Sequence, residues 1–209
     1  RALPIRIYVT VIWLLGGLAC FGWVVQTGQP QLMFMWAYPT FSVMMLALLV
    51  SISNSDQISL RVRRTIPQSR FKRAMAFVFF NGAAGGLLWV AVILVITFVA
   101  TGQVLTVFSS KVTTAIDGGY WFAATTAYAF AYALTALLIH RKFLSKRPPK
   151  LAGLLAVLLA GAWAIVPSGV LFFLNQLSWK AVEGMQPGNI FNIFSLRDDH
   201  ISLYHLYFA

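Results

Sequence analysis

Five long apolar stretches constrain this chain more than any other feature of its sequence. They run at about 7–26, 32–52, 74–100, 119–139 and 151–174. None of them contains Asp, Glu, Lys or Arg, and a helix crosses the hydrocarbon core of a bilayer with about 20 apolar residues. Charged residues make up only 10% of the chain, whereas soluble domains carry about 25%. The sequence therefore predicts an all-α integral membrane protein, with one transmembrane domain over 1–209.

The basic residues predict how these spans are oriented. Thirteen of the 16 lie before the first stretch, in the loop 53–73 or in the segment 140–150, with two, six and five residues respectively. Because basic residues concentrate on the cytoplasmic side, the N-terminus and both loops are expected there. The net charge of +11 then reflects topology and attraction to anionic membrane lipids, and no nucleic-acid partner is expected. We expect a multi-pass protein of the cytoplasmic (inner) membrane.

The two ends of the chain carry further expectations. It begins at Arg1 rather than Met, so we expect residues before it. The segment 175–209 is expected on the external side, and it becomes apolar again from Tyr204. We expect six spans in the full chain, with the sixth starting near Tyr204. The alternative for this region is a helix lying in the outer membrane interface.

The spans lack the chemistry of an ion-coupled carrier or an enzyme. A coupling ion is usually held by an ionisable residue inside the membrane, and these stretches offer only Asn81 and scattered Ser and Thr. No phosphate-binding loop, catalytic set or metal site is expected. If the chain moves a substrate, the energy must come from another protein.

The loop 53–73 is the place where such a partner would bind. Ser55 or Asp56 can cap a short helix that begins near Gln57. Pro67 ends this helix, because proline disfavours the helical conformation of the residue before it. Apolar and basic residues alternate around this helix: Ile58, Arg61, Val62, Arg63, Arg64 and Ile66. It is therefore a basic amphipathic helix joined rigidly to the third span. The alternative is an interfacial helix whose arginines bind lipid phosphates.

The residues around this loop carry a resemblance to a known family. Two spans are followed by a basic helix and then by a third span. The basic helix closes on Thr65-Ile-Pro-Gln-Ser-Arg70, and the third span opens with Ala76-Phe-Val-Phe-Phe-Asn-Gly-Ala-Ala-Gly-Gly-Leu-Leu-Trp89. This order resembles the type-two permease subunit of ATP-binding-cassette exporters. Asp56 alone stands where that family often has a Glu-rich stretch.

The resemblance implies six spans, with external re-entrant helices between the fifth and the sixth. It also implies that a coupling helix binds a separate ATPase subunit. The ATPase-coupling residues would be Asp56, Arg61, Val62, Arg64, Ile66, Pro67 and Arg70. ATP and Mg²⁺ would be bound by the ATPase, with no cofactor in this chain, and a second permease copy or a related permease would complete the path.

Small residues indicate where helices approach one another closely, since lipid provides no hydrophobic force between helices. Gly82 and Gly86 are four residues apart in the third stretch, and Ala156 and Ala160 recur at the same spacing in the fifth. These contacts lie within the chain or across a dimer. Asn81, Tyr128 and Tyr132 are predicted to line the transport path.

Two functions remain open from the sequence. The first is the permease subunit of an exporter, which is not itself an enzyme and moves an unidentified substrate with the help of a separate ATPase. The alternative is a non-catalytic membrane anchor or scaffold subunit of a larger complex, which would use the same small residues to pack against other helices.

Overall fold

The structure is a computed structural model that describes residues 2–54, 69–79, 82–108, 112–174 and 189–190. Every regular element in these ranges is a helix, and five of them are long and apolar enough to cross a membrane. The prediction of an all-α membrane protein is confirmed, and the chain is a multi-pass membrane protein. By contact it divides into two compact units, 1–112 and 113–209, which are described separately. The single domain expected over 1–209 stays a prediction, as do the orientation and the sixth span.

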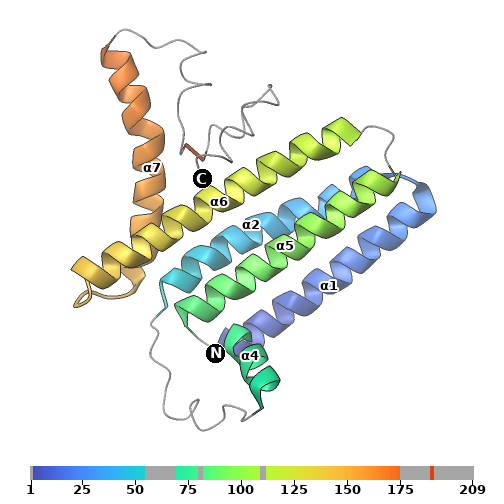
Figure 1. The fold of residues 1–209 in the computed structure, drawn as a ribbon, viewed down its shortest axis with the longest axis horizontal. Helices are drawn as coiled ribbons and strands as arrows, with labels where there is room; N and C mark the ends of the chain where they lie inside the picture. The colour runs from blue at the N-terminus through green and yellow to red at the C-terminus, as the bar shows by residue number, and fades with distance from the viewer. Residues whose placement is uncertain (1, 55–68, 80–81, 109–111, 175–188, 191–209) are drawn as a thin grey trace. The chain divides into compact units, whose positions relative to one another are not determined.

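The first unit is built around three long helices, α1 (Ala2–Thr27), α2 (Phe34–Ile52) and α5 (Ala83–Phe108). They lie side by side, with α2 antiparallel to the other two, and α2 makes its most extensive contact with α5 (Figure 1). A tight turn at Gly28 and the short helix η1 (Pro30–Met33) join α1 to α2. The φ angle of Gly28 is 68°, a conformation that glycine adopts without a steric penalty. The start of α1, the end of α2 and the start of α5 therefore meet at one end of this unit.

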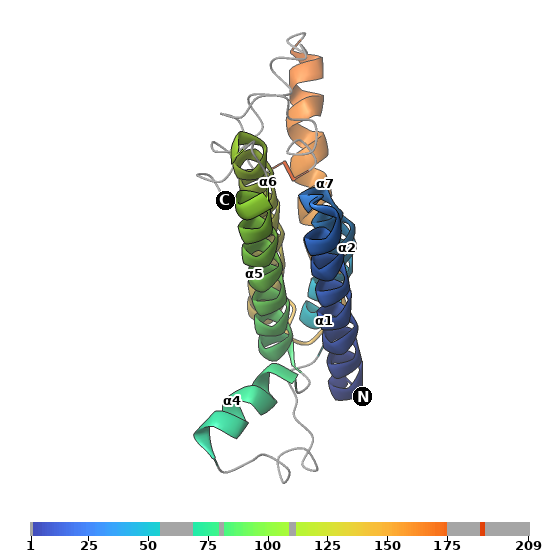
Figure 2. The same cartoon turned by 90° about the vertical axis from the view of Figure 1, so that its right-hand side faces the viewer.

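The third apolar stretch does not form the single helix expected at 74–100. The short helix α4 (Arg70–Phe79) ends before α5 begins at Ala83, and Figure 2 shows α4 running at a steep angle to α5. Gly82 precedes α5 with a φ angle of 142°, which side chains other than glycine rarely tolerate. The membrane-spanning part consequently starts later than predicted and continues to Phe108.

The first span also begins earlier than expected. The stretch 7–26 lies within α1, whose apolar segment is counted from Pro4. As a result Arg6, which the sequence places before the span, lies inside the helix and is buried. The helix continues from the apolar stretch back through Arg6 and Pro4 to Ala2, since proline is tolerated in the first turn of a helix.

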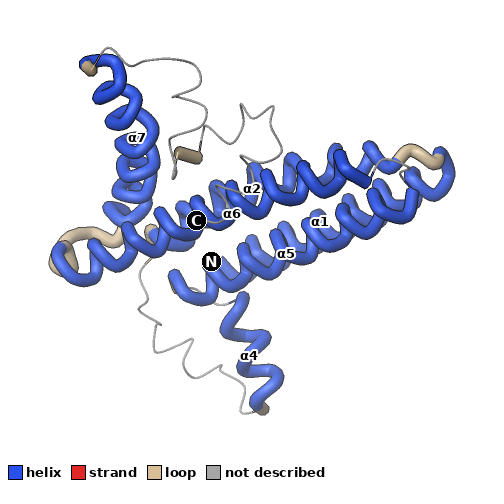
Figure 3. The backbone as a smooth tube through the Cα atoms, turned by 45° about the horizontal axis from the view of Figure 1, so that its top comes forward, coloured by secondary structure: helices blue, strands red, loops and turns tan. Residues whose placement is uncertain are grey.

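The second unit contains α6 (Val112–Phe143) and α7 (Lys150–Phe173), which cover the predicted spans at 119–139 and 151–174. A short turn joins them (Figure 3). Tyr128 on α6 is buried against Ala124, and Tyr132 and Ile190 pack against this pair. Two of the three residues predicted to line a path, Tyr128 and Tyr132, therefore lie in one packed cluster.

Candidate functional site

Most of the residues predicted to contact an ATPase lie outside the described residues. These are Asp56, Arg61, Val62, Arg64, Ile66 and Pro67, and the same holds for the path residue Asn81. Arg70 is described: it is the first residue of α4 and its side chain is exposed. The described part of the coupling segment is thus α4, with the contacts that attach α4 to the spans.

The attachment is made by a buried arginine. Arg6 on α1 is only 5% exposed, and its Nη1 donates a hydrogen bond of 2.9 Å to the backbone oxygen of Val78 on α4. Val78 lies in the last turn of α4, where carbonyl groups have no partner within the helix. A positive charge is also favourable at the carboxyl end of a helix. Arg6 therefore caps the end of α4 and joins it to α1.

The same guanidinium contacts α5. Its central carbon lies 5.8 Å from the centre of the Trp89 ring, which is the geometry of a cation–π interaction. Trp89 Nε1 donates to Thr10 Oγ1 at 3.0 Å, and Thr10 Oγ1 donates to the backbone oxygen of Arg6 at 2.7 Å. Arg6 and Thr10 lie one turn apart on one face of α1, so a single tryptophan holds both of them. Three helices of the first unit are joined at Arg6.

A glycine allows the end of α2 to reach this cluster. A Cβ atom added to Gly86 on α5 would lie 2.5 Å from Ser51 Cβ and 2.8 Å from Arg6 Nη2. No side chain except hydrogen can occupy that position without displacing α2 or Arg6. Gly86, one of the predicted packing residues, thus lies where α1, α2 and α5 converge, whereas Gly82 lies before α5 begins.

The predicted packing residues of α7 belong to the second unit. Ala156 is 3% exposed and Ala160 is half-buried. They face the interior of their unit to different extents, although they are four residues apart on the same helix.

A tryptophan pair continues the contact of α1 with α2 and α5 further along the helices. Trp13 and Trp36 are stacked with their ring centres 5.7 Å apart, and Trp36 Nε1 donates to the backbone oxygen of Trp13 at 2.9 Å. Trp13 Nε1 donates to Thr97 Oγ1 on α5 at 2.9 Å. Both indole N–H groups are satisfied, as buried donors in an apolar environment require. The ring of Trp36 also lies against Gly17, where an added Cβ would be 2.8 Å from Cζ2.

This cluster contains a cation, indole rings and hydroxyl groups. Within the described residues there is no group of three potential metal ligands. From 1 to 112 the sequence contains a single acidic residue, Asp56. A carbonyl oxygen on α4 and an indole ring on α5 are among the groups that Arg6 contacts, so one cation of α1 bridges two other helices.

No protein family, curated protein or solved structure matches this chain. The function is therefore argued from the residues above. From the sequence, Arg6 is one of the two basic residues before the first stretch, and no contact was predicted for it. The spacing of Arg6, Thr10 and Trp13 at i, i+4 and i+7 is the signal that places them on one helix face.

Proposed function

We propose that this chain is the permease subunit of an ATP-binding-cassette exporter, which moves a substrate across the membrane using ATP hydrolysed by a separate ATPase subunit. The observation that carries the proposal is the hydrogen bond from Arg6 to Val78. It ties α4, which follows the loop 53–68, to the first span, and the contact of Arg6 with Trp89 extends the link to the third span. A partner that displaces this loop would therefore displace the spans.

The mechanism requires two states that the ATPase binds differently. A ligand shifts an equilibrium only by its difference in affinity for the two states. In the proposed cycle, closure of the ATPase around ATP and Mg²⁺ pushes on the loop that contains Arg61 and Arg64, and α4 carries the push to α1 and α5. Gly82, with its φ of 142°, lies at the junction of α4 and α5, where a change in backbone direction is least costly. Such rigid-body movement of helices about a junction is a common form of switching.

The composition of the spans supports an external source of energy. The five described spans contain no Asp or Glu. In residues 1–112 the sequence contains one acidic residue, Asp56, and every other charged residue there is a cation. An ion-coupled carrier needs a residue that binds and releases the ion within the membrane. An ATPase partner supplies the same free energy without such a residue.

The test is copurification with an ATPase encoded beside the gene. The variant Arg61→Glu, Arg64→Glu is expected to lose the ATPase, because both cations are reversed in the predicted docking helix. The matched control Arg141→Glu, Lys142→Glu makes the same change of charge in the last turn of α6 and should retain the ATPase. Survival of ATPase binding in the first variant would remove the coupling role.

The alternative is a membrane anchor or scaffold subunit without transport activity. It predicts that the chain copurifies with other membrane subunits and that no gene for an ATPase with a phosphate-binding loop lies nearby. Proteoliposomes that contain the chain would then show no transport when ATP is added.

A further inference from the structure

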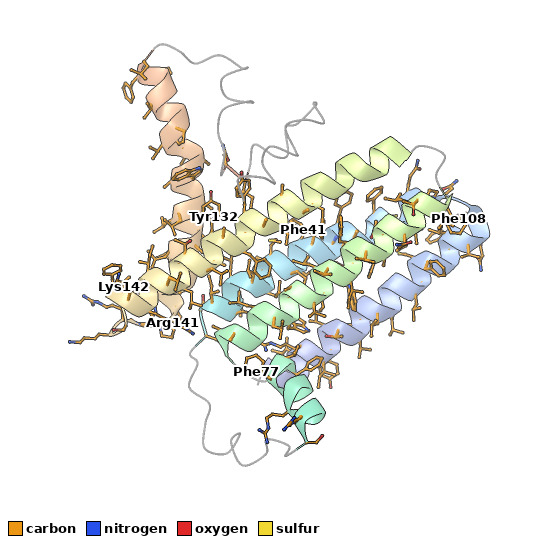
Figure 4. All side chains as sticks on the ribbon, viewed as in Figure 1. Phe41, Phe77, Phe108, Tyr132, Arg141 and Lys142 are labelled. Atoms are coloured by element: carbon orange, nitrogen blue, oxygen red, sulfur yellow. The ribbon has the colours of Figure 1, made fainter. Side chains whose placement is uncertain are left out.

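The end of α6, the turn that follows it and the first residue of α7 carry a dense group of cations that the proposed function does not use. All of them are exposed: Arg141, Lys142, Lys146, Arg147 and Lys150. The sequence contains no acidic residue from 118 to 182 to neutralise them within this part of the chain. Figure 4 shows Arg141 and Lys142 at the carboxyl end of α6. This group, called the basic turn below, is strongly complementary to an anionic surface.

The backbone of the basic turn is held in place. His140 is 8% exposed, and its Nε2 lies 3.1 Å from the backbone oxygen of Pro148. Since a carbonyl oxygen only accepts hydrogen bonds, Nε2 must carry the proton. The backbone N–H of Arg147 donates to the oxygen of Leu144 at 2.8 Å, and Pro149 restricts the φ angle just before α7. A turn ordered in advance loses less conformational entropy when its cations bind a ligand.

The position of the basic turn indicates which anion it meets. One candidate span ends at Phe143 and the next begins at Lys150, so the turn lies where the hydrocarbon core meets the headgroups. Phe143 is 71% exposed, and Lys142 Nζ lies 5.3 Å from the centre of its ring. An exposed aromatic ring among cations suits the boundary between lipid phosphates and acyl chains. A soluble anion without apolar groups would leave that ring in water.

We propose that the basic turn is a binding site for anionic phospholipid, in which the cations hold the headgroup phosphate and Phe143 contacts the acyl chains. The site is independent of the proposed transport function, because it lies in the second unit and uses no residue of the loop 53–73. Loss of ATPase binding would leave it intact.

The test compares the binding of phosphatidylglycerol and phosphatidylcholine to the full chain by native mass spectrometry. Each cation near an anionic surface contributes about fivefold to binding. The variant Lys142→Gln, Lys146→Gln, Arg147→Gln is therefore expected to lose at least about tenfold of the preference for phosphatidylglycerol. The charge-preserving variant Lys142→Arg, Lys146→Arg, Arg147→Lys should keep it. Circular dichroism checks that all variants keep their helical content.

Two further variants separate a specific site from diffuse charge. The first variant, Lys111→Gln, Lys180→Gln, Arg197→Gln, also removes three positive charges, but at positions expected on the outer side. It should keep the preference for phosphatidylglycerol. His140→Phe keeps every cation of the basic turn but removes the bond to Pro148, so a loss of about two- to fivefold is expected from one hydrogen bond. An equal loss in the outer-side variant, or no loss in the triple variant of the turn, overturns the proposal.

Competitors identify the source of the phosphate. Millimolar inorganic phosphate should leave phosphatidylglycerol bound, because it offers no acyl chain to Phe143. Displacement of the lipid by inorganic phosphate would contradict a lipid site. A second outcome would also contradict a lipid site: an RNA oligonucleotide binds through the basic turn, and the preference for phosphatidylglycerol does not depend on that turn.

Discussion

Thr97 and Thr101 lie one turn apart on α5, and both are buried, but their hydroxyl groups differ in what they contact. Thr97 Oγ1 accepts from Trp13 Nε1 and donates to the oxygen of Ile93. Thr101 Oγ1 is buried and has no hydrogen-bond partner among the described residues. The comparison of these two positions isolates the contribution of one buried polar contact.

Thr97→Val is expected to lower the free energy of unfolding by about 1–3 kcal/mol, because it leaves the buried N–H of Trp13 without an acceptor. Thr101→Val removes a hydroxyl that makes no bond and should be neutral or slightly stabilising. Unfolding of the purified chain in bicelles by added sodium dodecyl sulfate measures both values. Equal effects at the two positions would contradict the role of Thr97.

Gly86 and Gly102 provide a second matched pair on α5. An added Cβ meets Ser51 and Arg6 at Gly86, whereas nothing lies within 4 Å of it at Gly102. Gly86→Ala should cost about 1–3 kcal/mol through overpacking. Gly102→Ala should stabilise by up to about 1 kcal/mol through helix propensity.

The combination of Gly86→Ala with Ser51→Gly tests the cause of that cost. Ser51→Gly removes the Cβ atom that the new methyl group would meet at 2.5 Å, so most of the lost stability should return. The same unfolding assay measures it. If the double variant is as unstable as the sum of the two single variants, the contact between α2 and α5 is not the cause.

At the scale of elements, α4 is the piece whose attachment carries the proposed function. It is only 10 residues long, and short isolated helices are marginally stable in water. Its last turn is capped by Arg6, and α1 and α5 are the long helices that it contacts. The order of α4 should consequently depend on Arg6.

Arg6→Met keeps an extended side chain but removes the donor to Val78 and the charge over Trp89. Amide hydrogen exchange of peptides covering 70–79 is expected to accelerate by roughly tenfold or more, since a bond to a charged donor contributes about 1.5–3 kcal/mol. Exchange in α7 should not change. In the proposed exporter the variant should still bind the ATPase while transport falls, because the docking loop is intact and its connection to the spans is not.

At the scale of the whole molecule, the distribution of cations makes a prediction about orientation. Cysteine scanning in a Cys20→Ala background can test it, since Cys20 is the only cysteine of the chain. Gln29 and Ser145 are exposed, and they follow the first and the fourth span along the chain. If every span crosses the membrane, the two positions are expected on opposite sides. A membrane-impermeant maleimide should label Gln29→Cys in intact cells and Ser145→Cys only after permeabilisation. The reverse pattern would contradict the cytoplasmic placement of the basic loops and with it the docking of an ATPase there.

The sequence by itself determined the class of this protein and the approximate spans. Uncharged stretches as long as 151–174 leave few alternatives, because burying a charge in hydrocarbon is costly and every backbone group there must bond within the helix. Length and composition are local properties, so they can be read without knowing which helices are neighbours.

Only the tertiary structure decided what Arg6, Gly82 and Gly86 do. The sequence placed Arg6 before the span and paired the two glycines on one helix. In the structure Arg6 is buried against Val78 and Trp89, and Gly82 lies just before α5 rather than within it. Whether a cation is solvated or a glycine is needed depends on which atoms of other helices lie within a few ångströms. That is a property of packing between distant segments, and periodicity along one segment does not contain it.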